Sequence, residues 1–472
     1  MSYKFSEEKF VENFNAKNIE TKSVDSIRIT HRANNRFRLF PYKASTKLQS
    51  PVITELRDVV STFFKEVLNK KTTPIKYDVL CSNIREKTGL EIDEEDLDYF
   101  RDIIRALFFV EDNFITDNIA LYPYQSASSN KSVENLAHFL LSVFGMNRQD
   151  CTIVESAIKK NKCNVLDEMI KGAIESKEQA DIDEHASYFL IKTNIQNRFK
   201  KDFYFMINNG MTSMEDFSNL FAIYYFYYVS QTCVVLDKFC TCKRDEDLEL
   251  YYALDWEKVN KNRCCCTKGW SSLQNNINHM FSHAITLEIL NQTCEDNMYD
   301  YITLGEMAEV SSEMDTAIAN EIVKAETIYC SYVGDYRNFE EIVLKPSSSK
   351  TEGAIIHLYK CVESQFLMTE RKRAHQLYNE KFLDFCKSRW VKNRRKSGLV
   401  LNLRESDIIF LTKIALQDNE KMRLNDLFKE YEKRGIYLDG TSKEYLQEYF
   451  SRLNLIDKKS DSGDAQYVKR IL

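Results

Sequence analysis

The sequence predicts a mainly α-helical protein, with a multi-helical body followed by a C-terminal winged helix-turn-helix domain. The 472 residues include only 5 prolines and 12 glycines, so few helix-breaking residues interrupt the chain. Apolar residues recur at helical spacing over long stretches. Residues 400–472 contain three short amphipathic segments and then two extended ones, which is the element order of a winged helix.

Residues 1–50 are predicted to form an irregular, basic N-terminal arm. Between Arg28 and Lys47, Arg36 and Arg38 alternate with aromatic and aliphatic residues. Basic and aromatic residues interleaved in this way can bind nucleic acid. The pattern also fits an arm that packs on the body through its apolar residues, and we favour this second interpretation.

Residues 51–125 are predicted to form a small helical unit. One helix follows Pro51, because proline suits the first turn of a helix. Two more helices are expected near 74–88 and 94–109, and an extended piece follows them. Two helices and then an extended segment is a winged-helix-like order, so this unit is a second candidate for that fold.

The middle of the chain is predicted to be helical between two linkers. Residues 126–130 form the first linker and Pro346–Lys350 the second, and 130–345 between them form a central helical domain. The run 219–236 carries no charge, but its polar residues and tyrosines favour a buried central helix over a membrane span. After the second linker, 353–398 are expected to form one long helix with a basic C-terminal end.

In the winged helix predicted over 400–472, the first two helices cover 407–416 and 424–433. The third helix begins at Thr441 or Ser442. Its outward face carries Glu444 and Glu448, whose carboxylates repel phosphate. We therefore favour a winged helix that docks protein over one that reads DNA.

The strongest local charge lies just before this domain. Between Arg371 and Lys396 the net charge is +8, although the whole chain carries −6. Such a run can contact phosphate without base specificity, or it can be a solvated helix end paired with acidic neighbours on a partner, and both interpretations stay open. The candidate DNA-binding residues are Arg36, Arg38, Arg371, Lys372, Arg373, Lys387, Arg389, Lys392, Arg394, Arg395, Lys396, Lys458, Lys459, Lys469 and Arg470.

No catalytic motif is present in the sequence. It has no G-x-x-x-x-G-K-[ST] phosphate loop, no G-x-S-x-G elbow and no H-E-x-x-H pair. We expect no catalytic activity and no cofactor. The alternative is a metal-dependent nuclease with an unrecognised site built from Asp245, Asp247, Asp255 or Glu257.

The cysteines indicate a reduced, cytoplasmic protein. There are 13, an odd number without the spacing of a small disulfide-rich domain, and no signal peptide opens the chain. Cys264, Cys266, His279 and His283 nearly match the spacing of a zinc finger. One residue between the cysteines is too few for the usual turn, so these four are only weak metal candidates.

Four segments resemble those of the DptG family. The members of this family are subunits of DNA phosphorothioation-dependent restriction systems. The four segments are Ser460–Val468, Arg38–Tyr42, Leu254–Glu257 and Lys268–Trp270. The resemblance implies two protein partners, a DptF-like protein and a DptH-like ATPase, in a Dnd-associated complex that restricts unmarked invading DNA.

From this resemblance we expect a non-catalytic subunit of an antiviral defence complex in the cytoplasm. It would bridge protein partners and hold double-stranded DNA, with no membrane contact. A winged-helix DNA-binding regulator is the other alternative, and the family brings no established catalytic residues to this chain.

Overall fold

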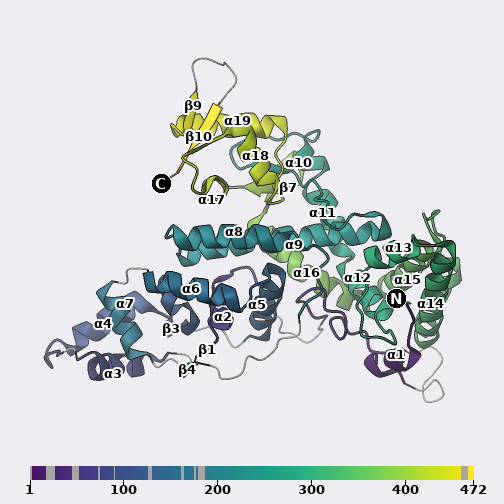
Figure 1. Ribbon diagram of the computed structural model, residues 1–472, viewed down its shortest axis with the longest axis horizontal. Helices are drawn as coiled ribbons and strands as arrows, with labels where there is room; N and C mark the ends of the chain where they lie inside the picture. Colours follow the sequence, from purple (N-terminus) through teal and green to yellow (C-terminus); the bar gives the residue numbers. More distant parts are fainter. Residues whose placement is uncertain are drawn as a thin grey trace.

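The protein is mainly helical, as the sequence predicts, and its strands form only small sheets (Figure 1). The computed structural model describes residues 3–17, 27–44, 53–72, 75–89, 91–125, 130–160, 164–174, 177–178, 187–458 and 466–471. The predicted linker at 126–130, except Asn130, and 460–465 of the tail segment lie outside these ranges.

The N-terminal arm contains one helix that the sequence did not predict, α1 (Glu7–Asn13). The Ser6 hydroxyl accepts a hydrogen bond from Lys9 N at 3.3 Å, which caps its first turn. Residues 27–44 contain no helix, and their apolar side chains are buried in the main core, including Phe37, Leu39 and Phe40. The packed-arm interpretation is therefore confirmed for this described part of the arm.

The next elements form the lower left of Figure 1. They are α2 (Arg57–Val67), β1 (Lys70–Lys71), α3 (Tyr77–Thr88), α4 (Leu97–Phe108), β2 (Phe109–Val110), β3 (Asn113–Phe114), the 3-10 helix η2 (Ile119–Tyr124), α5 (Lys131–Phe144), α6 (Arg148–Lys160), α7 (Val165–Ala173) and β4 (Lys177–Glu178). The predicted helices near 74–88 and 94–109 are confirmed as α3 and α4. With α7 and the β2–β3 hairpin, they enclose a small apolar core of their own.

The centre of the molecule is built around one long and largely buried helix, α9. The central elements are α8 (Ile195–Asn208), α9 (Met214–Asp237), η3 (Phe239–Thr241), β5 (Tyr252–Leu254), α10 (Cys264–Thr267), α11 (Trp270–Asn278), α12 (Met280–Leu290) and α13 (Tyr301–Ala308). A helix that is apolar all round must be surrounded by protein, and α2, α8, α11 and α17 pack against α9. The predicted buried helix over 219–236 is confirmed.

The single long helix predicted over 353–398 is wrong, because two helices and a hairpin occupy this segment. They are α15 (Lys350–Leu367), α16 (Lys372–Arg389), β6 (Val391–Asn393) and η5 (Arg395–Ser397). Thr369 Oγ1 donates to Gln365 O at 2.7 Å and accepts from Arg371 N at 3.3 Å. A threonine that hydrogen-bonds its own backbone in this way competes with the helical ladder and ends α15.

The last elements begin with a strand that belongs to the body. They are β7 (Leu399–Leu403), α17 (Glu405–Leu416), β8 (Lys421–Arg423), α18 (Leu424–Glu432), α19 (Gly440–Arg452), β9 (Ile456–Lys458) and β10 (Gln466–Lys469). Strand β7 pairs in parallel with β5 and antiparallel with β6. The other three strands form an antiparallel sheet in the order β8–β10–β9, at the top of Figure 1.

Candidate functional site

The basic segment 371–396 does not form one exposed cationic face. Arg394 donates to Leu254 O at 2.6 Å, to Asp255 O at 3.2 Å and to Asn402 Oδ1 at 2.6 Å. It therefore ties the loop after β6 to the end of β5, and its role in this structure is to satisfy buried carbonyls.

Most other cations of this segment have acidic partners nearby. The ion pairs are Arg371–Asp335 at 3.8 Å, Arg373–Glu380 at 3.1 Å, Lys387–Asp384 at 3.8 Å and Lys392–Asp255. Lys372, Arg395 and Lys396 are exposed, with no ion pair among the described residues. Both interpretations of this segment stay open, because pairing within the chain tests neither contact with phosphate nor pairing with a partner.

Arg36 and the buried Glu288 carboxylate hold the arm on the body. Arg36 donates to Glu295 O at 2.5 Å and lies 3.3 Å from an Asp296 oxygen. The Glu288 carboxylate accepts three consecutive backbone N–H groups, from residues 35, 36 and 37, at 3.2, 2.8 and 3.0 Å. Burial raises the pKa of Glu288 to about 7, although these hydrogen bonds favour its charged form. Arg38 is half-buried, and its carbonyl accepts from Phe189 N.

The C-terminal sheet carries the clearest basic surface. Lys421 and Arg423 of β8 lie opposite Lys469 and Tyr467 of β10. Lys421 Nζ and the Arg423 guanidinium lie 5.5 and 6.0 Å from the centre of the Tyr467 ring. Like charges directly opposite each other weaken a sheet, but Lys421 Nζ also lies 3.2 Å from Asp457 Oδ2 of β9, which offsets the repulsion between Lys421 and Lys469. We call these four residues the basic sheet face.

Of the predicted wing residues, only Lys469 lies on the basic sheet face. Arg470 instead donates to Asn209 Oδ1 at 2.9 Å, next to the end of α8. Lys459 and the Lys458 side chain lie outside the described residues. Lys421 and Arg423 were not among the predicted residues, because no strand was expected between the first two helices of this unit. Three residues are too few for a period-2 pattern to identify a strand.

Residues of the body contact the start of α19. Arg263 donates to both Asp439 oxygens, at 2.7 and 2.6 Å, and to Ser442 Oγ at 2.8 Å. The Trp256 and Tyr449 rings lie 4.6 Å apart between centres. Arg263 therefore ties the first turn of this helix to the loop that follows β5, although Gly440 and Thr441 stay exposed.

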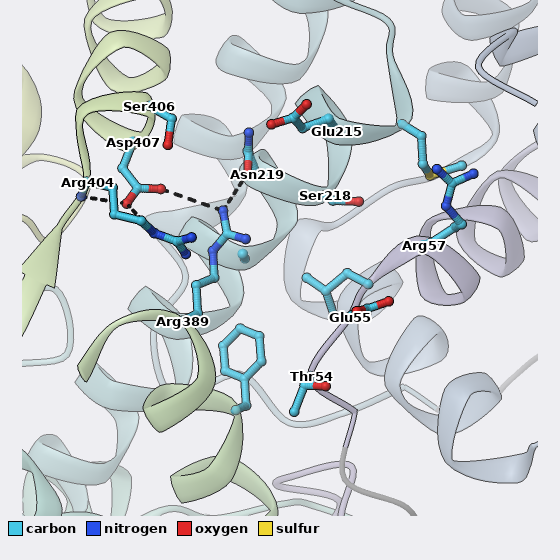
Figure 2. Close-up of a pocket in the computed structure, with 14 residues that line it drawn as sticks. Thr54, Glu55, Arg57, Glu215, Ser218, Asn219, Arg389, Arg404, Ser406 and Asp407 are labelled. Carbon is cyan, nitrogen blue, oxygen red and sulfur yellow. Dashed lines mark hydrogen bonds and ion pairs between the residues drawn. The ribbon is translucent and has the colours of Figure 1, made fainter. Parts of the chain in front are cut away.

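A polar pocket of about 310 Å³ lies where α2, α9, α16 and α17 meet (Figure 2). The first turns of α2, α9 and α17 line it, and helix N-termini favour anions. Figure 2 shows Arg389 between Asn219 and Asp407. Its Nη2 donates to Asn219 Oδ1 at 2.5 Å and lies 3.9 Å from Asp407 Oδ1.

The charges around this pocket nearly balance one another. Burial lowers the pKa of Arg389, and its buried Nε has no hydrogen-bond partner among the described residues. Arg57 and Arg404 add positive charge, while Glu55 and Glu215 add negative charge. Its lining contains neither histidine nor cysteine. The pocket can hold a small polar group, but its lining offers no nucleophile beside a general base.

The weak zinc candidates do not form one site. Cys266 Sγ donates to Asn260 O at 3.3 Å, whereas His279 Nδ1 and His283 Nε2 lie 2.9 and 2.8 Å from Asp237 Oδ1. Cys264 lies with Cys266 in the short α10. The two histidines lie on one face, as predicted, but the group that both contact is the Asp237 carboxylate.

The carboxylates of the nuclease alternative are bound by different cations. Asp247 lies 2.9 Å from Lys192 Nζ and 2.7 Å from Arg198 Nη1. Asp255 pairs with Lys392, and Glu257 lies 3.2 Å from Arg263 Nη2. Asp245 belongs to the same loop as Asp247, and its carbonyl accepts from Asn194.

Comparisons with known proteins add no relative, since no protein-family model matches the chain and a search of curated proteins finds no match. Among the described helices, none combines the length and the apolar character required to cross a membrane.

Proposed function

We propose that this chain is a non-catalytic, DptG-type subunit of a phosphorothioation-dependent DNA restriction complex. It bridges a DptF-like protein and a DptH-like ATPase and holds double-stranded DNA. The observation that carries this proposal is a pair of exposed surfaces with opposite chemistry on separate parts of the molecule (Figure 1). One is an apolar stripe on α4, and the other is the basic sheet face.

The apolar stripe on α4 supports the bridging role. Tyr99, Ile103 and Leu107 follow one another at i, i+4 and i+8, so they lie on one face of the helix. They are 72%, 50% and 53% exposed, and Val110 continues the stripe at 55%. Large apolar side chains gathered on a surface mark protein interaction sites.

We infer that α17 to β10 form a winged helix that grips DNA through its sheet. The order α17–β8–α18–α19–β9–β10 and the antiparallel sheet β8–β10–β9 support this assignment. Recognition helices enter the major groove with their N-terminal residues, but Arg263 holds that end of α19 against the body. The basic sheet face therefore supplies contacts to phosphate, which position a duplex without reading its sequence.

The test is a tagged purification of the chain co-expressed with the two partner proteins, followed by binding of a duplex at several salt concentrations. Lys421→Glu with Lys469→Glu should lower DNA affinity and reduce the slope of log affinity against log salt by about 2, since two phosphate contacts are lost. Ile103→Asp with Leu107→Asp should lower recovery of a partner at least about tenfold and leave DNA binding unchanged.

Two control variants match these changes in chemistry. Lys324→Glu with Lys345→Glu makes the same change of charge on an exposed surface of α14 (Ser312–Tyr332) and the loop that follows it. Val310→Asp replaces an exposed valine that lies after α13. The proposal fails if the controls affect DNA or partner recovery as much as the test variants do, or if the unmodified chain recovers neither partner nor DNA.

A further inference from the structure

Helices α14 (Ser312–Tyr332) and α15 run parallel to each other, at the right of Figure 1. Near their starts, Asp315 accepts from Lys350 N at 3.0 Å and from Thr351 N at 2.8 Å. Near their ends, Gln365 Nε2 donates to Asp335 Oδ1 at 3.2 Å. Residues at matching heights on the two helices therefore face each other.

This alignment brings two pairs of metal-ligand residues together at one level. Glu326 and Cys330 lie four residues apart on α14, and His357 and Cys361 lie four residues apart on α15. Residues four apart share one face of a helix. The four side chains thus offer one carboxylate, one imidazole and two thiols between two packed helices.

The ligand atoms are already close. Glu326 Oε2 lies 2.8 Å from His357 Nδ1, and Cys361 Sγ lies 3.7 Å from the same nitrogen. These three atoms all lie within 4.8 Å of one another. A hydrogen bond with Cys330, together with burial, raises the pKa of the Cys361 thiol. Cys330 thus contacts Cys361 but lies outside this group of three, so its side chain has to turn toward Glu326 and His357 to serve as the fourth ligand.

The distances between these ligand atoms are close to the distances between ligand atoms in a tetrahedral zinc site. Bonds of about 2.3 Å to sulfur and about 2.0–2.1 Å to nitrogen place those two ligands about 3.6 Å apart. The sulfur–nitrogen separation of 3.7 Å already matches this value. The oxygen–nitrogen pair has to open from 2.8 Å to about 3.3 Å, because a zinc ion replaces the hydrogen bond.

The surroundings also suit a bound cation. Cys361 is fully buried, while the Glu326 and His357 side chains are 16% and 28% exposed, so the group is closed on one side and reachable from the other. In the described part of the chain, no lysine or arginine pairs with Glu326, in contrast with Asp247, Asp255 and Glu257. Two thiols with one imidazole select zinc over magnesium or calcium.

We propose that Glu326, Cys330, His357 and Cys361 bind a structural zinc ion that clamps α14 to α15. The ion displaces the protons of both thiols and of His357 Nδ1, and it completes a closed tetrahedral shell of one oxygen, one nitrogen and two sulfur ligands.

The test measures metal in the full-length protein, purified under reducing conditions and dialysed against metal-free buffer. The wild-type chain should retain about one zinc ion, and Cys361→Ser should retain less than about a tenth of that. His357→Gln, at a partly exposed position, tests the same site with less risk to folding. Cobalt(II) added to the wild type should give thiolate-to-cobalt charge-transfer absorption, which Cys330→Ser should reduce by about half, because one of two thiolates is lost.

Cys386→Ser is the matched control. Its buried thiol lies near Cys233, but no imidazole or carboxylate of the described residues joins these two in a metal-binding group. This variant should retain zinc and the cobalt absorption. The proposal is overturned if wild-type protein binds neither ion, if zinc content is the same in Cys361→Ser, or if the purified chain contains a Cys330–Cys361 disulfide in place of zinc.

Discussion

Asp237 shows how one buried carboxylate sets different protonation states for two histidines. Burial alone would raise the pKa of Asp237, but its hydrogen bonds with His279 and His283 hold it well below the usual range. The hydrogen bond with Asp237 raises the pKa of His279, whereas burial lowers the pKa of His283. The shared carboxylate therefore favours the charged form of His279, whereas burial favours the neutral form of His283.

This difference predicts a pH dependence of stability. The raised pKa of His279 contributes stability that is fully present below about pH 6.5 and is lost as pH rises through its folded-state value. Because the imidazole is 37% exposed, the loss should be less than about 1 kcal/mol. Urea unfolding between pH 6.5 and 8.5 should show this loss in the wild type and a flatter profile in His279→Gln.

The control for this measurement is His375→Gln. Burial lowers the pKa of His375 to about 4, so its titration affects stability only below pH 6.5. It should keep the wild-type slope between pH 6.5 and 8.5. If the unfolding free energy of His279→Gln fell between pH 6.5 and 8.5 as steeply as that of the wild type, the assignment of the charge to this imidazole would be contradicted.

Residue chemistry was only partly predictable from the sequence. The four-residue spacing of His279 and His283 correctly predicted a shared face, because helical geometry is local. Their partner Asp237 lies 42 and 46 residues earlier, and nothing in the local pattern selects it. The same limit applies to Arg394, which looks like a surface charge in the sequence and is used to satisfy backbone carbonyls.

At the scale of elements, the sequence predicted helices better than their ends. The periodicity of 407–416 and 424–433 gave α17 and α18 nearly to the residue. The break between α15 and α16 carries neither glycine nor proline; a threonine side chain and the packing of both helices decide it. Likewise β8 is too short for a period-2 pattern to identify, and its partner β10 lies at the far end of the chain.

Gly435, in the turn after α18, gives a test at the element scale. Its φ is +77°, and an added Cβ would lie 2.2 Å from Tyr227 Cδ2 on α9. Gly435→Ala should therefore lower the unfolding free energy by more than the roughly 1–2 kcal/mol that a left-handed conformation costs an L-residue. Gly210→Ala is the matched control, because Gly210 has φ of +72° with no atom within 4 Å.

Thermal and urea unfolding of both variants separate the two causes. An equal loss of stability in both would mean that the backbone conformation alone matters and that Tyr227 moves away freely. A larger loss in Gly435→Ala would show that close packing of the turn after α18 on α9 fixes this turn.

For the whole molecule, the sequence predicted an α-rich body and a compact C-terminal unit, but it did not predict how they join. The joint is a buried ion pair between Asp202 of α8 and Arg434, which are 232 residues apart. Arg434 Nε and Nη2 donate to the two Asp202 oxygens at 2.7 and 2.6 Å, and Tyr224 donates to the same carboxylate at 2.8 Å. Both charges are almost fully buried, and Arg434 also lies 3.0 Å from Glu430 Oε2, so Asp202 depends on Arg434 more than Arg434 depends on Asp202.

Arg434→Met should therefore cost about 3–5 kcal/mol, because it leaves the Asp202 carboxylate buried without its cation. If the pair is the joint, hydrogen exchange should rise across α17, α18 and α19 more than in α9.

Adding Asp202→Leu removes the buried charge and should restore much of the lost stability. Arg470→Met, which removes a more exposed contact to Asn209 beside α8, should cost less than about 1 kcal/mol. The two arginine substitutions could instead have equal effects on stability, or hydrogen exchange could rise uniformly throughout the chain. Either result would mean that apolar contacts hold the C-terminal unit. The basic sheet face would then keep its position even without the ion pair.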